Sequence, residues 1–283
     1  MSVARRAGLA GGMVLWRHLL PTGGVVSGIT VTSVFTQAAR ADLRAELLSA
    51  AEGDKMIDAA ALFGSAARDA EDRWSDIDLA FGLAPGCDVL EVAARWTHLL
   101  YQSHGARAHV DIWSGDALYR VFLMDSTLQI DLSFWPVGTL RATGGPLRLV
   151  FGRAADAAPL SKPDLTAVIG MAWLYALHAR SSIARGRGLQ AVHMLNGLRD
   201  QVVTLGCLRA GLPASQGRGV DDLDAPLRRR IEDSLATNLA EEELRRVFAA
   251  LVSLLLEEAA AAAPEAAGSI EDVLQGLINS FDG

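Results

Sequence analysis

The sequence predicts an α+β fold in two parts: a mixed β-sheet backed by helices on one side, followed by an all-α helical bundle. Short apolar or alternating runs typical of strands occur within residues 34–155, whereas no strand pattern follows residue 164. Two prolines among small residues at 154–163 indicate a linker. The chain has 283 residues, 51% of them hydrophobic, which is enough to bury two cores. We therefore expect one domain at 34–155 and a helical domain at 156–283.

The first domain is expected to combine helices with strands. One amphipathic helix carries leucines on one side, and a second helix has apolar residues at helical spacing up to Gly105, a typical C-terminal stop. Residues 128–134 alternate apolar and polar side chains, and the short turn 124–127 before them favours an antiparallel hairpin. The expected helices are 35–51 and 88–105, and the expected strands are 56–63, 76–79, 108–113, 119–123, 128–134 and 147–151.

The second domain is divided by breaks that contain glycine and proline into four or five predicted helices. They are expected at 164–185, 189–210, 224–238, 240–262 and 269–281. Residues 1–33 begin with Arg5-Arg6 and a short apolar run that Arg17 interrupts, too short to span a bilayer. We interpret residues 1–33 as a poorly structured extension or the product of an upstream start.

The most informative segment is 63–81, where ten residues separate a Gly-Ser pair from an Asp-Ile-Asp run. On a strand, Asp76 and Asp78 leave the same face, roughly 6 to 7 Å apart, while Ile77 enters the core behind them. Two like charges at this separation repel unless a cation lies between them. Magnesium fits this role, because it takes oxygen ligands from one or two carboxylates and from substrate phosphates.

The Gly-Ser pair predicts a phosphate site. A buried strand precedes it and residues 65–71 fit a first helical turn, a junction that points backbone N–H groups and the positive helix end at an anion. Gly64 would let a phosphate approach the backbone, and Ser65 adds a hydroxyl donor.

Together these features resemble the nucleotidyltransferase superfamily that includes DNA polymerase beta, and within it the small-molecule branch of aminoglycoside and lincosamide nucleotidyltransferases. The family pattern is a hydrophobic residue, Gly, Gly or Ser, roughly a dozen residues, then Asp-hydrophobic-Asp/Glu-hydrophobic. It is met by Phe63, Gly64, Ser65, Asp76, Ile77, Asp78 and Leu79. The resemblance covers about residues 55 to 135.

The resemblance implies a nucleotidyltransferase fold, magnesium on Asp76, Asp78 and a third acid, and nucleotide binding by Gly64 and Ser65. The implied reaction moves a nucleoside monophosphate, AMP from ATP being the expected case, to a hydroxyl of a small molecule and releases pyrophosphate. Arg68, in the loop after the Gly-Ser pair, is a candidate to neutralise phosphate charge or is an ordinary surface charge.

Two positions compete for the third acid. Asp131 lies on the polar face of the amphipathic strand 128–134 and is the first choice, as a metal ligand or as the base that deprotonates the acceptor hydroxyl. Asp111, beside His109 on an earlier strand, is the runner-up.

Composition bears on the class of substrate. A net charge of −7 gives no global attraction for nucleic acid, which argues against a polynucleotide substrate. An enzyme that uses ATP is expected in the cytoplasm, and Cys87 and Cys207 have no metal-site spacing, so we expect reduced thiols. The sequence leaves open whether the protein is a homodimer.

The helical domain offers a rival interpretation. Arg187 and His193 match the arginine-histidine spacing of HEPN ribonucleases, which are paired with minimal nucleotidyltransferases in toxin-antitoxin modules. Arg199, in the second helix of this domain, is either a contact for the triphosphate or a surface charge.

Overall fold

The computed structural model describes residues 34–157 and 163–281, and these fall into two compact units, one on each side of the gap between them. Residues 1–33, interpreted above as an extension, lie outside the described residues, as does half of the predicted linker, residues 158–162. The first unit contains α1 (Gln37–Gly53), β1 (Ile57–Leu62), the 3-10 helix η1 (Ala66–Arg68), β2 (Ile77–Leu83), α2 (Val89–Ser103), β3 (Ala106–Ser114), β4 (Ala117–Met124), β5 (Gln129–Trp135) and β6 (Arg148–Phe151). The second contains α3 (Leu165–Ala184), α4 (Gly188–Arg209), the 3-10 helices η2 (Ser215–Gly217) and η3 (Val220–Asp222), α5 (Ala225–Asp233), α6 (Glu241–Ala262), α7 (Pro264–Gly268) and α8 (Glu271–Asn279).

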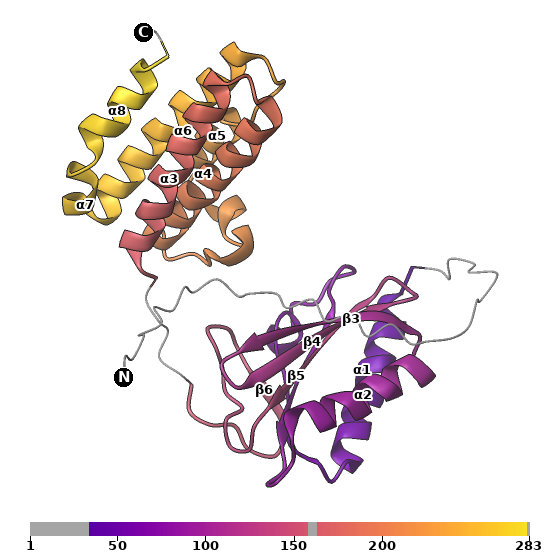
Figure 1. The fold of residues 1–283 in the computed structure, drawn as a ribbon. Coiled ribbons are helices and arrows are strands. Elements are labelled where there is room, and N and C mark those ends of the chain that lie inside the picture. The colour runs from indigo at the N-terminus through magenta and orange to yellow at the C-terminus, as the bar shows by residue number, and fades with distance from the viewer. Residues whose placement is uncertain (1–33, 158–162, 282–283) are drawn as a thin grey trace, which may run out of the picture. The chain divides into compact units, whose positions relative to one another are not determined.

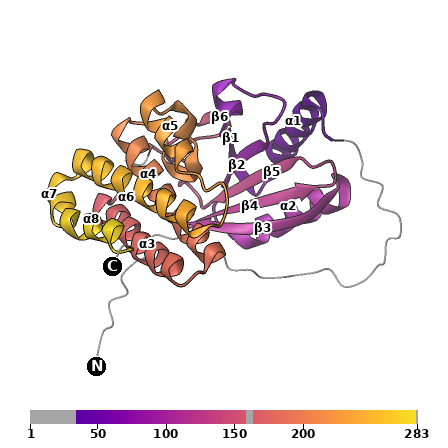
Figure 2. The same cartoon turned by 90° about the horizontal axis from the view of Figure 1, so that it is seen from above.

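The first unit is built on a six-stranded sheet with the order β3-β4-β5-β2-β1-β6, which Figure 2 shows from above. The β2–β5 pair is parallel and the other pairs are antiparallel, so the sheet is mixed. This confirms the α+β class. The parallel pair lies at the centre, where β5 returns beside β2 after α2 and the β3–β4 hairpin have intervened.

Helices α1 and α2 cover one face of this sheet (Figure 1), as the alternation of apolar residues predicts. Ile77, Leu79 and Phe81 alternate along β2 and are fully or almost fully buried against this layer. Trp96 of α2 joins the same core, with its ring 4.5 Å from that of Phe81 between centroids. The side chains between these positions, beginning with Asp78, therefore point to the opposite face.

That opposite face has a much smaller apolar cluster, made mostly of alanines together with Trp135 and Leu140. The indole N–H of Trp135 donates to the hydroxyl of Ser133 at 2.9 Å. Leu140 lies in the segment after β5 and is the nearest side chain to Gly82 apart from Ala59. This second cluster covers one part of that face. It does not include the acidic residues at the start of β2.

The second unit is helical, and α3, α4 and α6 pack on one another around a core of leucine, valine and alanine (Figures 1 and 2). The helix predicted at 224–238 ends earlier, at Asp233, because Ser234 caps it and binds Arg199. Arg199 is buried, donating to the Ser234 hydroxyl and carbonyl and to Asn196, so it is neither a surface charge nor available to a triphosphate.

Both cysteines are free, and Cys207 is buried in the helical core. None of the helices in the described residues combines the length and hydropathy that a bilayer crossing requires.

Candidate active site

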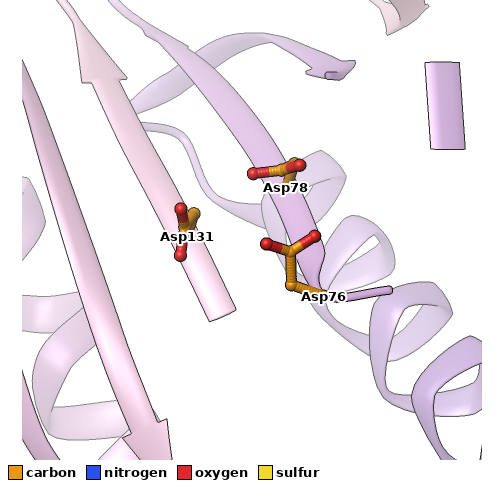
Figure 3. A group of neighbouring side chains, drawn as sticks. All are labelled: Asp76, Asp78 and Asp131. Carbon is orange, nitrogen blue, oxygen red and sulfur yellow. The ribbon is translucent and has the colours of Figure 1, made fainter. Parts of the chain in front are cut away.

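The centre of the site is set by the parallel pairing of β2 with β5. In this register Asp78 is the direct partner of Asp131, with Ile77 opposite Ile130 and Leu79 opposite Leu132. Because facing residues of paired strands point to the same side, both carboxylates leave the face opposite α1 and α2 while their neighbours enter the core. Figure 3 shows the two aspartates on adjacent strands.

Asp76 completes a group of three acids. It precedes the first residue of β2, so it lies just outside the strand that the sequence predicts for it. One carboxylate oxygen from each of Asp76, Asp78 and Asp131 lies within 4.8 Å of the others, and all three residues are half-buried. In Figure 3 the carboxylate of Asp76 points toward Asp78, and an oxygen of Asp78 is directed toward the strand that bears Asp131.

This donor set fits a hard divalent cation. Two oxygens on opposite sides of one Mg²⁺ are about 4.2 Å apart, since each Mg–O distance is about 2.1 Å. Oxygens on neighbouring sides of the ion are about 3 Å apart. The three aspartate oxygens lie within 4.8 Å of one another, so the side chains have to rotate toward one another for all three to bind one ion. Carboxylates also suit a pair of such ions, which lie about 3.5–4 Å apart in two-metal sites.

Sequence reasoning missed Gln129, the first residue of β5. Its amide donates to Asp131 Oδ1 at 2.8 Å and to Asp76 Oδ2 at 3.5 Å. The amide thus bridges two of the three acids and offsets part of their mutual repulsion. Its position two residues before Asp131 on an alternating strand was the available signal.

Gly64 is in contact with the acids from the other side. Its φ of +58° is in the left-handed region, and a Cβ built there would lie 2.0 Å from Asp78 Oδ2. The backbone of the Gly-Ser turn therefore reaches the carboxylate at a distance that excludes any side chain. The Phe63 N–H donates to the Asp78 carbonyl at 3.2 Å and fixes this approach.

The helix predicted after the Gly-Ser pair is shorter than expected. Ser65 caps a single turn of 3-10 helix, η1, and Asp69 is left-handed at φ +53°. Since a macrodipole grows with aligned peptide units, η1 supplies little of the helix-end charge expected from residues 65–71. What the turn offers to an anion is the backbone N–H groups and the Ser65 hydroxyl.

Arg68 ends η1 and is exposed to solvent. Nearby, Arg148 of β6 is paired with Asp69, the residue after Arg68. Two arginines therefore lie beside the Gly-Ser turn, of which sequence reasoning named only Arg68.

Asp111, the runner-up for the third acid, lies on β3, which β4 separates from β5. Both its oxygens accept from the Arg120 guanidinium at 2.6 Å, and Arg120 is buried and also donates to Thr97 at 2.7 Å. The structure thus places Asp131 beside Asp76 and Asp78. It holds Asp111 in a bidentate ion pair with Arg120.

His109 lies two residues before Asp111 on β3, and its contacts also indicate a structural role. Its Nδ1 lies 3.0 Å from the Tyr101 hydroxyl. Burial, and then the charge of Arg120, lower the pKa of His109, while Asp111 raises it. We therefore expect a neutral imidazole near pH 7, packed against Phe122 rather than facing the acids.

Among solved structures, the chain is similar to the crystal structure of an aminoglycoside 6-adenyltransferase from Bacillus subtilis, with 12% identity and a TM-score of 0.39. The similarity covers 86% of this chain and 99% of that one. No protein-family model and no curated protein matches the chain. The neighbour is of the class that the sequence motif resembles.

The close contact at Gly64 can be tested by Gly64→Ala. A left-handed non-glycine residue costs about 1–2 kcal/mol, and the added methyl would also displace the Asp78 carboxylate. We expect a lower melting temperature and weaker Mn²⁺ binding, measured by thermal unfolding and calorimetry. Gly86→Ala is the matched control, because Gly86 also has a positive φ, +83°, but no atom within 4 Å of its added Cβ. Equal Mn²⁺ affinity of Gly64→Ala and Gly86→Ala would show that a side chain at position 64 does not displace the Asp78 carboxylate.

The different surroundings of Asp111 and Asp131 predict opposite phenotypes. Asp111→Asn leaves the buried Arg120 without a counter-charge, so it should lower the free energy of unfolding by about 1–3 kcal/mol with Mn²⁺ binding unchanged. Asp131→Asn should leave unfolding by urea nearly unchanged and weaken Mn²⁺ binding. If Asp111→Asn instead abolished binding, the assignment of the third acid would have to change.

Proposed function

We propose that this protein is a magnesium-dependent nucleotidyltransferase. It would move a nucleoside monophosphate, AMP from ATP in the favoured case, to a hydroxyl of a small molecule such as an aminoglycoside or lincosamide antibiotic. The observation that carries the proposal is the group of three aspartates, two on adjacent parallel strands and the third just before β2, with the Gly-Ser turn in direct contact with one of them.

In this proposal Asp76 and Asp78 hold magnesium on the triphosphate, while Asp131 either shares a second ion or accepts the proton of the acceptor hydroxyl. Bound magnesium would neutralise phosphate charge and stabilise the charge that develops on the leaving pyrophosphate. The protein supplies positioning: the strand pairing fixes Asp78 against Asp131, and Gln129 orients the oxygen of Asp131 to which it donates.

Gly64 and Ser65 are proposed to bind the β and γ phosphates. The absence of a side chain at Gly64 lets the turn lie directly against the Asp78 carboxylate. The N–H groups of the turn and the Ser65 hydroxyl can donate to phosphate oxygens. Arg68 is proposed to balance phosphate charge from the exposed end of η1.

The reaction forms one bond and breaks one. The acceptor oxygen bonds to the α-phosphorus, the bond from that phosphorus to the bridging oxygen of the β-phosphate breaks, and the electron pair leaves with pyrophosphate. The hydroxyl proton goes to Asp131 in the general-base form of the proposal, or to water if Asp131 is a ligand only.

Several accompanying properties belong to the proposal. We propose domain boundaries at residues 34–155 and 156–283 and a cytoplasmic location. We also propose that its substrate is not a nucleic acid. The rival nuclease hypothesis rests on Arg187, the N-cap of α4, and His193 within α4, both exposed.

Incubation of the protein with ATP, Mg²⁺ and a panel of aminoglycosides and lincosamides should give an acceptor heavier by one AMP, detected by mass spectrometry, and pyrophosphate. Asp76→Asn, Asp78→Asn and Asp131→Asn should each reduce the rate by at least about 100-fold, because even outer-shell partners of a metal are worth roughly 10–100-fold. Their circular dichroism and melting should stay close to wild type.

Asp116→Asn, at an exposed position between β3 and β4, is the control and should keep full activity. Full activity in the three acid variants would refute the proposed metal site. RNA cleavage that is lost in His193→Ala would favour the nuclease instead.

A further inference from the structure

A buried arginine lies beneath the loop that connects η1 to β2. Arg40 belongs to α1 and is only 4% exposed. Its Nη1 donates to the carbonyl of Asp72 at 2.6 Å and to the carbonyl of Ser75 at 2.9 Å. Its Nε lies 3.4 Å from Glu71 Oε1, so a single guanidinium contacts three residues of the loop.

The contact with Ser75 is the important one, because the Ser75 carbonyl belongs to the peptide group that enters Asp76. Asp76 precedes β2 and has no place in the sheet ladder, unlike Asp78 and Asp131. The strand register therefore cannot fix Asp76 as it fixes the other two acids. Hydrogen bonds on the preceding peptide can do so, because they limit rotation about the backbone that carries the carboxylate.

The loop is also ordered from within. Asp72 accepts from the Trp74 N–H at 2.8 Å and from the Ser75 hydroxyl at 3.0 Å, and its own N–H donates to that hydroxyl at 2.9 Å. The hydrogen bond from the Trp74 N–H, followed by that from Ser75, lowers the pKa of Asp72. These hydrogen bonds hold the loop in one conformation, and Arg40 links it to α1.

A lysine could not replace these contacts. The planar guanidinium donates to two carbonyls from one nitrogen and faces Glu71 with another, whereas an ammonium is a single point charge. Arg44, one turn further along α1, is the natural comparison, since it also pairs with Glu71 but, within the described residues, does not hydrogen-bond to the carbonyls of the loop.

We propose that Arg40 is a positioning residue of the acidic site: by holding the Ser75 peptide it places Asp76 beside Asp78 and Asp131, and so sets the affinity for the divalent cation. This proposal rests on the function proposed above. It adds to the site a residue on the side of the sheet that α1 and α2 cover. This residue acts through the backbone of Asp76, a proposed metal ligand.

The test is Mn²⁺ binding to the full chain without nucleotide, by calorimetry, in Arg40→Met, Arg40→Lys and Arg44→Met. We expect the Kd for Mn²⁺ to rise about tenfold or more in Arg40→Met and in Arg40→Lys, as for other residues that orient metal ligands. Arg44→Met should stay within about twofold of wild type, since the Ser75 peptide keeps its hydrogen bond. Thermal unfolding of each variant separates affinity from stability, and Arg40→Lys remains informative if Arg40→Met does not fold.

A purely structural role predicts another pattern. If Arg40→Lys or Arg40→Met melts at a lower temperature but binds Mn²⁺ with wild-type affinity when folded, the positioning role is overturned. Failure of the proposed function looks different again: wild type and Asp76→Asn would then bind Mn²⁺ equally weakly, whatever residue occupies position 40.

Discussion

The parallel pairing of β2 with β5 places two carboxylates directly opposite each other on the sheet face opposite α1 and α2, and the rest of the site compensates for their mutual repulsion. Two unit charges about 5 Å apart interact by roughly 3 kcal/mol at an effective dielectric of 20. The strands tolerate this because Ile77, Leu79, Ile130 and Leu132, which flank the two acids on the other face, are completely or almost completely buried. A rigid apolar layer thus keeps like charges together, as a cation site requires.

Three different parts of the chain contact the acids or the backbone that carries them. Gly64 lets the backbone of the turn touch Asp78, Gln129 places an amide between Asp131 and Asp76, and Arg40 holds the peptide before Asp76. Each contact reaches the acids from a different element, so the geometry does not depend on one loop. By contrast, Asp111 is also a carboxylate, but its ion pair with Arg120 makes it part of the framework.

Much of this could be predicted from the sequence because the signals were local. The alternation of residues 128–134, the apolar run before Gly64 and the helical spacing of α2 each reflect one element packing against one layer, and the structure confirms them. What could not be predicted depends on tertiary pairing. The register that sets Asp78 against Asp131, rather than a residue of β3, is fixed only when all strands are placed. The close approach at Gly64 likewise depends on the pairing of β1 with β2. Arg40 was missed for the same reason, since an arginine on an amphipathic helix is ordinarily a solvated charge.

The most direct measurement is the anomalous signal of manganese in crystals grown or soaked with MnCl₂ and a non-hydrolysable ATP analogue. The geometry described here requires a manganese peak within about 2.3 Å of carboxylate oxygens of Asp76 and Asp78, with Asp131 bound to the same ion or a neighbouring one, and phosphate beside Gly64 and Ser65. Manganese bound elsewhere, or an analogue whose phosphates avoid the Gly-Ser turn while the crystal binds the metal, would contradict it.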